Sequence, residues 1–169
     1  APAAGAPPSP WPARLAWPGH FVIVAGSTWA PDEEVLLRAL RHVGERKPPL
    51  RLILAPHEPT AEHLASTEAL LGSLGFTSQR LATVEDAPVT ADAVLVDRVG
   101  VLGDIYAAAD IGYVGGGWGT AGLHSVLVPA AFGAPVLFGP RHANAREAGD
   151  LVEALGQPVV PGAPLGLGE

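Results

Sequence analysis

The stretch FVIVAGSTWAPDEE, residues 21–34, contains a complete unit of the predicted fold. Residues 21–26 are apolar and rich in β-branched side chains, which is typical of a strand buried on both faces. Pro31 suits the first turn of a helix, and the acidic residues 32–34 favour the positive end of its dipole. Apolar residues continue the helix at helical spacing, namely Leu36, Leu40 and Val43. The stretch therefore predicts a strand, a tight turn and a helix.

The same alternation continues along the rest of the chain. Further strands are expected at 50–56, 79–84, 93–97, 111–116 and 135–140. Helices are expected after Thr60 and within 102–109, 123–133 and 144–156. Short apolar strands separated by helices indicate a parallel sheet covered on both faces. The predicted fold class is α/β, a doubly wound Rossmann-like parallel sheet.

Polar residues and glycines mark the expected helix ends. Thr60 and Asn144 are predicted N-caps, because their side chains can accept a hydrogen bond from the first helical turn. Gly44, Gly75 and Gly156 are predicted just beyond helix ends, where glycine adopts the required backbone conformation.

Length and composition predict one globular domain with irregular ends. The chain has 169 residues, of which 48% are hydrophobic and 16% charged, so a sizeable core can form. Residues 1–19 are rich in proline and alanine and are expected to form a linker or tail, residues 20–157 the domain, and residues 158–169 an irregular tail. Because the chain does not begin with Met, we expect a piece of a longer protein or a processed form.

The charge and the residue types limit the function. A net charge of −7 disfavours general nucleic-acid binding, which usually requires a basic surface. The chain has no cysteine, which excludes disulfides and thiolate metal sites. It has no run of 18 apolar residues, and no pair of histidines with a carboxylate at zinc-binding spacing.

Ligands of such folds bind outside the carboxyl ends of the strands. That rule selects five turns, which we expect to share one edge of the sheet: 26–29, 56–59, 97–102, 115–125 and 139–144.

The turn Gly26, Ser27 and Thr28 follows the first strand and offers amide and hydroxyl groups at a helix start. Such a turn suits an anion such as phosphate. The alternative is a tight turn in which Ser27 or Thr28 is an ordinary N-cap. There is no Walker lysine, which disfavours ATPase chemistry.

The stretch YVGGGWGTAGLHS, residues 113–125, is the most glycine-rich part of the expected edge. Glycine loses much conformational freedom on folding, so a run of it needs a reason. Either the loop is a flexible connection, or its bare backbone approaches a ligand. Its spacing is not that of a dinucleotide fingerprint.

His57 and His124 both fall on the expected edge, which favours a functional role for each more than a single histidine there would. His142 lies near it beside Arg141, as a solvated pair or as cations near an anionic ligand. Three other histidines fall elsewhere and are interpreted as solvated, namely His20, His42 and His63. Asp97 and Asp110 are interpreted as structural groups at strand ends. No nucleophile is plainly paired with a base, so no catalytic residue is assigned.

Four segments together resemble the carboxyl-terminal half of the 3-deoxy-D-manno-octulosonic acid (Kdo) transferases: AGSTWAPDEEVLL (25–37), LILAPHEPT (52–60), the nearly continuous stretch 94–140 and HANAREAGDLV (142–152). The resemblance covers about residues 21–156. It implies a GT-B glycosyltransferase of lipopolysaccharide assembly, whose amino-terminal half holds the lipid A precursor and the catalytic base. The carboxyl-terminal half of such an enzyme binds the donor, CMP-Kdo, and transfer requires no metal or other cofactor.

The resemblance assigns donor-binding residues by position in this chain. They are Gly26, Ser27, Thr28, His57, Arg98, Val99, Gly100, Val101, Leu102, Gly115, Gly116, Gly117, His124 and Ser125. It also implies partners outside this chain, namely an amino-terminal acceptor domain and, through it, a lipid A precursor. A cytoplasmic protein peripheral to the inner membrane is the implied location, with no nucleic acid as partner.

Two positions depart from the family's His-Asn-x-Leu-Glu run, because Ser125 stands for the Asn and Val128 for the Glu. The loss of a carboxylate removes a hydrogen-bond acceptor and is expected to weaken or change donor binding. The alternatives are therefore a relative that uses a UDP-sugar, as a transferase or an epimerase, and a nucleotide-binding domain without catalysis. In the leading interpretation, helix N-termini support the leaving CMP, helped by Arg98 or Arg141.

Overall fold

The fold is a single parallel sheet of six strands. The computed structural model describes residues 9–43 and 48–155. The strands run in the order β3-β4-β2-β1-β5-β6 and all neighbours pair in parallel. Their bounds are β1 Phe21–Thr28, β2 Leu50–Pro56, β3 Ser78–Arg80, β4 Ala93–Leu95, β5 Ile111–Val114 and β6 Val136–Phe138. The predicted Rossmann-like fold class is confirmed.

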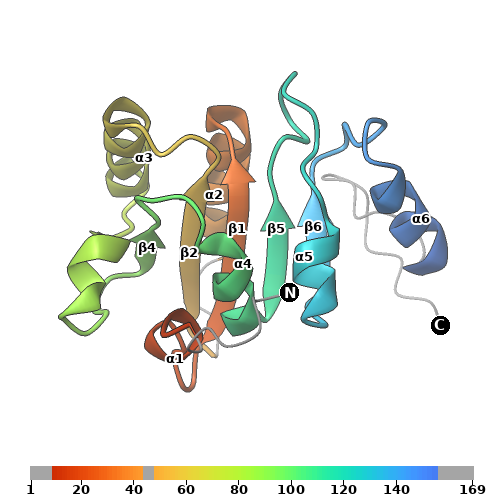
Figure 1. Cartoon of the computed structure of the whole chain (residues 1–169). Coiled ribbons are helices and arrows are strands. Elements are labelled where there is room, and N and C mark those ends of the chain that lie inside the picture. The colour runs from red at the N-terminus through yellow and green to blue at the C-terminus, as the bar shows by residue number, and fades with distance from the viewer. Residues whose placement is uncertain (1–8, 44–47, 156–169) are drawn as a thin grey trace.

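Helices cover both faces of this sheet (Figure 1). Their bounds are α1 Trp11–Arg14, α2 Ala30–Val43, α3 Ala61–Ser73, α4 Leu102–Ile105, α5 Leu127–Ala131 and α6 Arg146–Leu155, with 3-10 helices η1 Leu81–Glu85 and η2 Tyr106–Ala108. In Figure 1, α4 and α5 lie in front of the sheet and α2 lies behind it. None of the helices within the described ranges is long and apolar enough to cross a membrane.

Alternation along β1 divides its side chains between two cores. Val22 and Val24 pack with α1, η1 and η2, whereas Ile23 and Ala25 pack with α2 and α3. Since successive strand residues point to opposite faces, an apolar strand serves both cores at once. This is why the sequence of β1 is apolar without alternation.

The strand predicted at 79–84 is wrong beyond its first two residues. β3 ends at Arg80, and η1 follows. Leu81 and Val84 are both buried in the same core. Two residues three positions apart share a face in a 3-10 helix and not in a strand, so the burial pattern selects the helix.

Part of the stretch predicted as a linker takes part in the fold. Trp11 is 7% exposed and Leu15 is fully buried, and both belong to the core under α4 and η2. Apolar side chains within a proline-rich stretch thus attach α1 to the sheet.

The helix ends agree with the sequence only in part. The Thr60 hydroxyl accepts from the N–H of His63, and Gly75 follows α3 with a φ of +83°, as predicted. Asn144 does not cap α6. Its side chain binds both the N–H and the carbonyl of Leu123, at 3.0 and 2.9 Å. The predicted ends at Gly44 and Gly156 lie outside the described residues.

Candidate functional site

Four of the five predicted turns meet at the carboxyl edge of the sheet. They are residues 26–29, 56–59, 115–125 and 139–144, here called the rim. The N–H of His57 donates to Thr28 O at 2.9 Å, that of Gly115 to Gly26 O at 2.9 Å, and that of Arg141 to Gly117 O at 3.0 Å. The convergence expected from the strand-end rule is confirmed for these turns.

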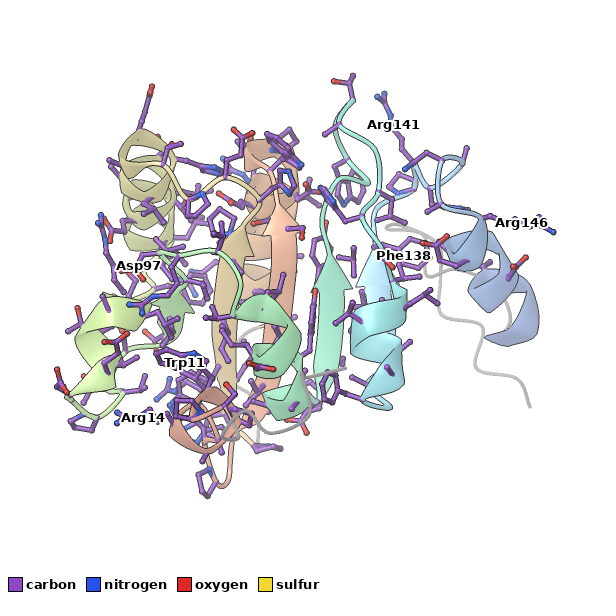
Figure 2. The ribbon with its side chains drawn as sticks, viewed as in Figure 1. Trp11, Arg14, Asp97, Phe138, Arg141 and Arg146 are labelled. Carbon is purple, nitrogen blue, oxygen red and sulfur yellow. The ribbon has the colours of Figure 1, made fainter. Side chains whose placement is uncertain are left out.

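The fifth turn, residues 97–102, is divided between two places. The Leu102 side chain packs against Gly26, where a Cβ would lie 2.7 Å from its Cδ2. Arg98 turns the other way, with its guanidinium 5.7 Å from the Trp11 ring and paired with Glu85. Figure 2 shows Trp11 and Asp97 on the side of the molecule away from Arg141.

The exposed centre of the rim is an aromatic cluster of Trp29, His57 and His124. The two imidazoles stack with centroids 4.3 Å apart, and the Trp29 ring lies 4.9 Å from His57. The indole N–H donates to Nε2 of His124 at 3.4 Å. The sequence pointed to both histidines, but it gave no role to Trp29.

The cluster disfavours the protonated form of His124. Burial and the neighbouring His57 lower the pKa of His124, while Asp32 acts in the opposite direction. Because Nε2 accepts from the indole, the proton of the neutral ring is on Nδ1. His124 therefore offers one N–H donor to a ligand, and an anionic ligand would favour a second proton.

Ser27 and Thr28 play different roles at the end of β1. Ser27 has a φ of +53°, a left-handed conformation that costs energy for a residue with a Cβ and is often found at functional sites. Thr28 is fully buried, and its hydroxyl donates to Oε1 of Glu33 at 2.9 Å. Only Ser27 thus presents a hydroxyl at this turn.

The glycines of the rim allow backbone to pack on backbone. A Cβ on Gly115 would overlap the Ser27 carbonyl, and one on Gly117 would lie 2.6 Å from Cα of Gly139. Gly116 has a φ of +96°, and a Cβ there would overlap the Gly122 carbonyl. Neither a flexible connection nor ligand approach was the full reason for these glycines, since contacts between loops already require them.

Asp32 joins the glycine loop to the start of α2. It is fully buried, and its Oδ2 accepts from the N–H of Gly116 at 2.9 Å and of Trp29 at 3.0 Å. Its Oδ1 accepts from the Tyr113 hydroxyl at 3.2 Å. Burial, followed by the Asp32 charge, raises the pKa of Tyr113, so the phenol stays protonated and donates. The sequence assigned Asp32 to the helix dipole alone and missed this role.

His63 is a correction to the sequence interpretation, because it is not solvated. Its side chain is 16% exposed and its Nε2 lies 3.0 Å from Oε1 of Glu33. Glu33 is 2% exposed and also accepts from Thr67 at 2.7 Å. A buried carboxylate must be hydrogen-bonded, and this one recruits partners from β1 and α3.

The other predicted positions are spread over the surface. Val99 is 76% exposed, and Gly100 has a φ of +87°. Ser125 is exposed, and its hydroxyl accepts from the Leu127 N–H at 3.4 Å. His142 meets the Phe138 ring edge-on at 5.4 Å.

Arg141 and Asp110 complete the description of charged groups near the sheet. Arg141 is exposed at the rim and donates to the Gly119 carbonyl at 3.4 Å, so its charge remains available. Asp110 accepts from the N–H of Val22 at 2.7 Å at the opposite end of β1, which confirms its structural role.

The rim can bind an anion by its donors. The N–H groups of residues 118–121 have no acceptor among the described residues, and Arg141 contacts the same loop at the Gly119 carbonyl. A surface cavity of about 490 Å³ lies elsewhere, beside η1. Arg14 lines it and donates hydrogen bonds to the carbonyls of Val84 and Glu85. Among the described residues, no group of three or more His, Asp or Glu could hold a metal ion.

Comparisons with known proteins agree on one group of relatives. The chain is 34% identical over 122 residues to the 3-deoxy-D-manno-octulosonic acid transferase of Aquifex aeolicus, which covers 72% of this chain and 32% of the relative. It is 33% identical over 135 residues to that of Chlamydophila psittaci, covering 79% of this chain and 29% of the relative. The chain thus spans about a third of the length of these relatives. No family model matches.

A solved structure matches the fold of the domain. It is the C-terminal CMP-Kdo binding domain of WaaA from Acinetobacter baumannii, with a TM-score of 0.67 and 25% identity. The match covers 81% of this chain and 70% of that one. The chain is therefore a homologue of the carboxyl-terminal domain of the Kdo transferases, as its sequence motifs indicated.

Proposed function

We propose that this homologue of the Kdo transferases is a donor-binding half that holds CMP-Kdo at the rim. The observation that carries the proposal is the convergence of four strand-end turns on the cluster of Trp29, His57 and His124. The likeness to a CMP-Kdo binding domain supports the identity of the ligand.

The chemistry of the donor fits the groups on the rim. CMP-Kdo carries a phosphodiester and a carboxylate, both of which need N–H donors or positive charge. The free loop amides 118–121, the Nδ1–H of His124 and the Arg141 guanidinium supply them. Departure of CMP would leave negative charge on its phosphate, and donors already fixed in place stabilise such charge most effectively.

Transfer itself would require a second domain. The relatives are about three times as long as the matched region, which leaves room for a domain that holds an acceptor and a base. We propose that a lipid A precursor binds to that domain and that the full protein works at the cytoplasmic side of the inner membrane. Alone, this chain would bind the donor nucleotide weakly and transfer nothing.

Calorimetry with CMP, UMP and phosphate tests the proposal. We expect the 169-residue chain to bind CMP with a dissociation constant on the order of a millimolar or below, and to bind phosphate more weakly. His124→Ala should weaken CMP binding about tenfold through loss of a charge-assisted hydrogen bond, whereas His42→Ala should not. His42 is the matched control because it is exposed at the end of α2.

The outcomes separate the alternatives. Absence of CMP binding at millimolar concentration would contradict the proposal. Tighter binding of UMP than of CMP would indicate a donor with uracil instead. Binding of CMP that is insensitive to His124→Ala would move the site away from the rim.

A further inference from the structure

We propose that His63, which is not on the rim, is a positioning residue for the donor site. It joins the buried Glu33 to the turn that presents His57. The expected effect on CMP affinity rests on the proposed function. The positioning of His57 by His63 rests on the geometry alone.

His63 bonds through both ring nitrogens. Its Nε2 lies 3.0 Å from Oε1 of Glu33, and its Nδ1 lies 3.1 Å from the carbonyl oxygen of Glu58. The ring of His63 thus connects two groups from different parts of the chain, the Glu33 side chain and the Glu58 backbone. The Glu33 side chain is only 2% exposed, so one end of this connection is in the core.

This pair fixes His57 from two sides. The N–H of His57 donates to the Thr28 carbonyl at 2.9 Å, and the Thr28 hydroxyl donates to Glu33 at 2.9 Å. The carbonyl of the next residue, Glu58, is bound by His63. Glu33 thus contacts both groups that hold the backbone around His57, while the His57 ring stacks with His124 and stays exposed at the rim.

The place of His63 in α3 makes the connection stiff. His63 lies in the first turn, where its N–H donates to the Thr60 hydroxyl at 3.2 Å. The N–H of Thr60 donates to the same Glu58 carbonyl at 2.8 Å. The turn 57–60 is therefore closed by a backbone bond, and two bonds tie it to buried groups: the His57 N–H to the Thr28 carbonyl, and the His63 imidazole, which links the Glu58 carbonyl to Glu33.

Two substitutions separate the two bonds of His63. A glutamine amide reproduces the Nε2 donor, so His63→Gln keeps the bond to Glu33 and removes the one to Glu58. An asparagine amide reproduces the Nδ1 donor, so His63→Asn does the reverse. Thr67→Val is the matched control, because it removes the hydroxyl that bonds Glu33 at 2.7 Å and the His63 carbonyl at 2.9 Å, but leaves both ring bonds of His63 and residues 57–60 in place.

The experiment measures CMP affinity, thermal stability and the ring signals of His57. We expect His63→Gln to bind CMP about tenfold more weakly than the unchanged chain, with shifted or broadened His57 signals in the ligand-free protein. Thr67→Val should lower the Tm at least as much as His63→Gln but leave the affinity within about twofold. If the loss of CMP affinity is proportional to the loss of Tm in His63→Gln, His63→Asn and Thr67→Val alike, the positioning role is overturned.

The ligand-free measurements decide the proposal even if CMP does not bind. In nitrogen-15 spectra of the ligand-free protein at pH 7, the ring signals of His57 should differ between the unchanged chain and His63→Gln. His57 signals that are the same with and without His63→Gln would overturn the proposal. Failure of the unchanged chain to bind CMP, with His57 displaced in His63→Gln, would instead reject only the donor assignment.

Discussion

The loops after β1 and β5 contrast with the loop after β4. Residues 26–33 and 115–117 are held by buried carboxylates, by a hydroxyl and by glycines packed backbone to backbone. The 97–102 loop has an exposed Val99 and an Arg98 turned to Trp11. The first region is preorganised by bonds within the protein, whereas the second holds one side chain in solvent and one turned away from the rim.

The difference shows how preorganisation can be read from hydrogen-bond partners. The carboxylate oxygens of Asp32 accept hydrogen bonds from the protein itself. Asp32 therefore fixes the backbone of Gly116 and Trp29 rather than binding a ligand. Fixed donors cost little to reorganise when a charged ligand binds. We expect substitutions in the first region to affect stability and binding together, and those in the 97–102 loop to leave stability nearly unchanged.

The largest loss of stability is expected from Gly116→Val. The new side chain would overlap the Gly122 carbonyl, and its backbone would be strained at a φ of +96°. We expect a loss of unfolding free energy of about 3 kcal/mol or more, measured by urea denaturation. Gly119→Ala is the control, since its nearest neighbour would be 3.7 Å away and its effect should stay below about 1 kcal/mol. Equal effects at both positions would contradict the packing argument.

Asp32→Ala comes next. It leaves the N–H of Gly116, the N–H of Trp29 and the Tyr113 hydroxyl without their acceptor. Unsatisfied buried donors predict a loss of about 2–4 kcal/mol in unfolding free energy, seen in the same denaturation experiment. Asp104→Ala, at an exposed position of α4, should cost less than about 0.5 kcal/mol. A small effect of Asp32→Ala would mean that water replaces the carboxylate.

Arg98→Ala tests the looser region. It removes a partly exposed ion pair with Glu85 and the contact with the Trp11 ring. Such contacts contribute about 0.5–1 kcal/mol each at most, so the Tm should fall by only a few degrees. If CMP binding weakens more than the Tm change suggests, the 97–102 loop takes part in the site after rearrangement.

The smallest effect is the pH dependence from His124. Burial and His57 lower its pKa in the folded state, so the folded protein binds this proton less readily than the unfolded chain does. Its contribution to stability is therefore complete above the ordinary histidine pKa and declines as the pH falls toward the lowered value. We expect the Tm loss between pH 7.5 and pH 5.5 to be smaller in His124→Gln. If the Tm of His124→Gln depends on pH as that of the unchanged chain does, the pH dependence arises from another group.

The sequence predicted most of the sheet and the turns at its carboxyl edge. Five of the six strands were located as apolar runs bounded by turn residues, whereas β3 is polar and overlaps its predicted range only at residues 79–80. The strand-end rule then selected His57 and His124 from the six histidines of the chain. The stretch after Arg80 was predicted wrongly, since a short apolar segment fits strand or helix periodicity equally well.

The sequence by itself determined a parallel α/β sheet, the turns at its carboxyl edge and the relationship to the Kdo transferases. Those features follow from local periodicity and from short motifs, which are written along the chain. Only the tertiary structure decided which groups meet there: Asp32 with Gly116, Glu33 with His63, and glycine with glycine across loops. These contacts exist because β1 lies between β2 and β5, and that order results from pairing between distant segments, which no local pattern encodes.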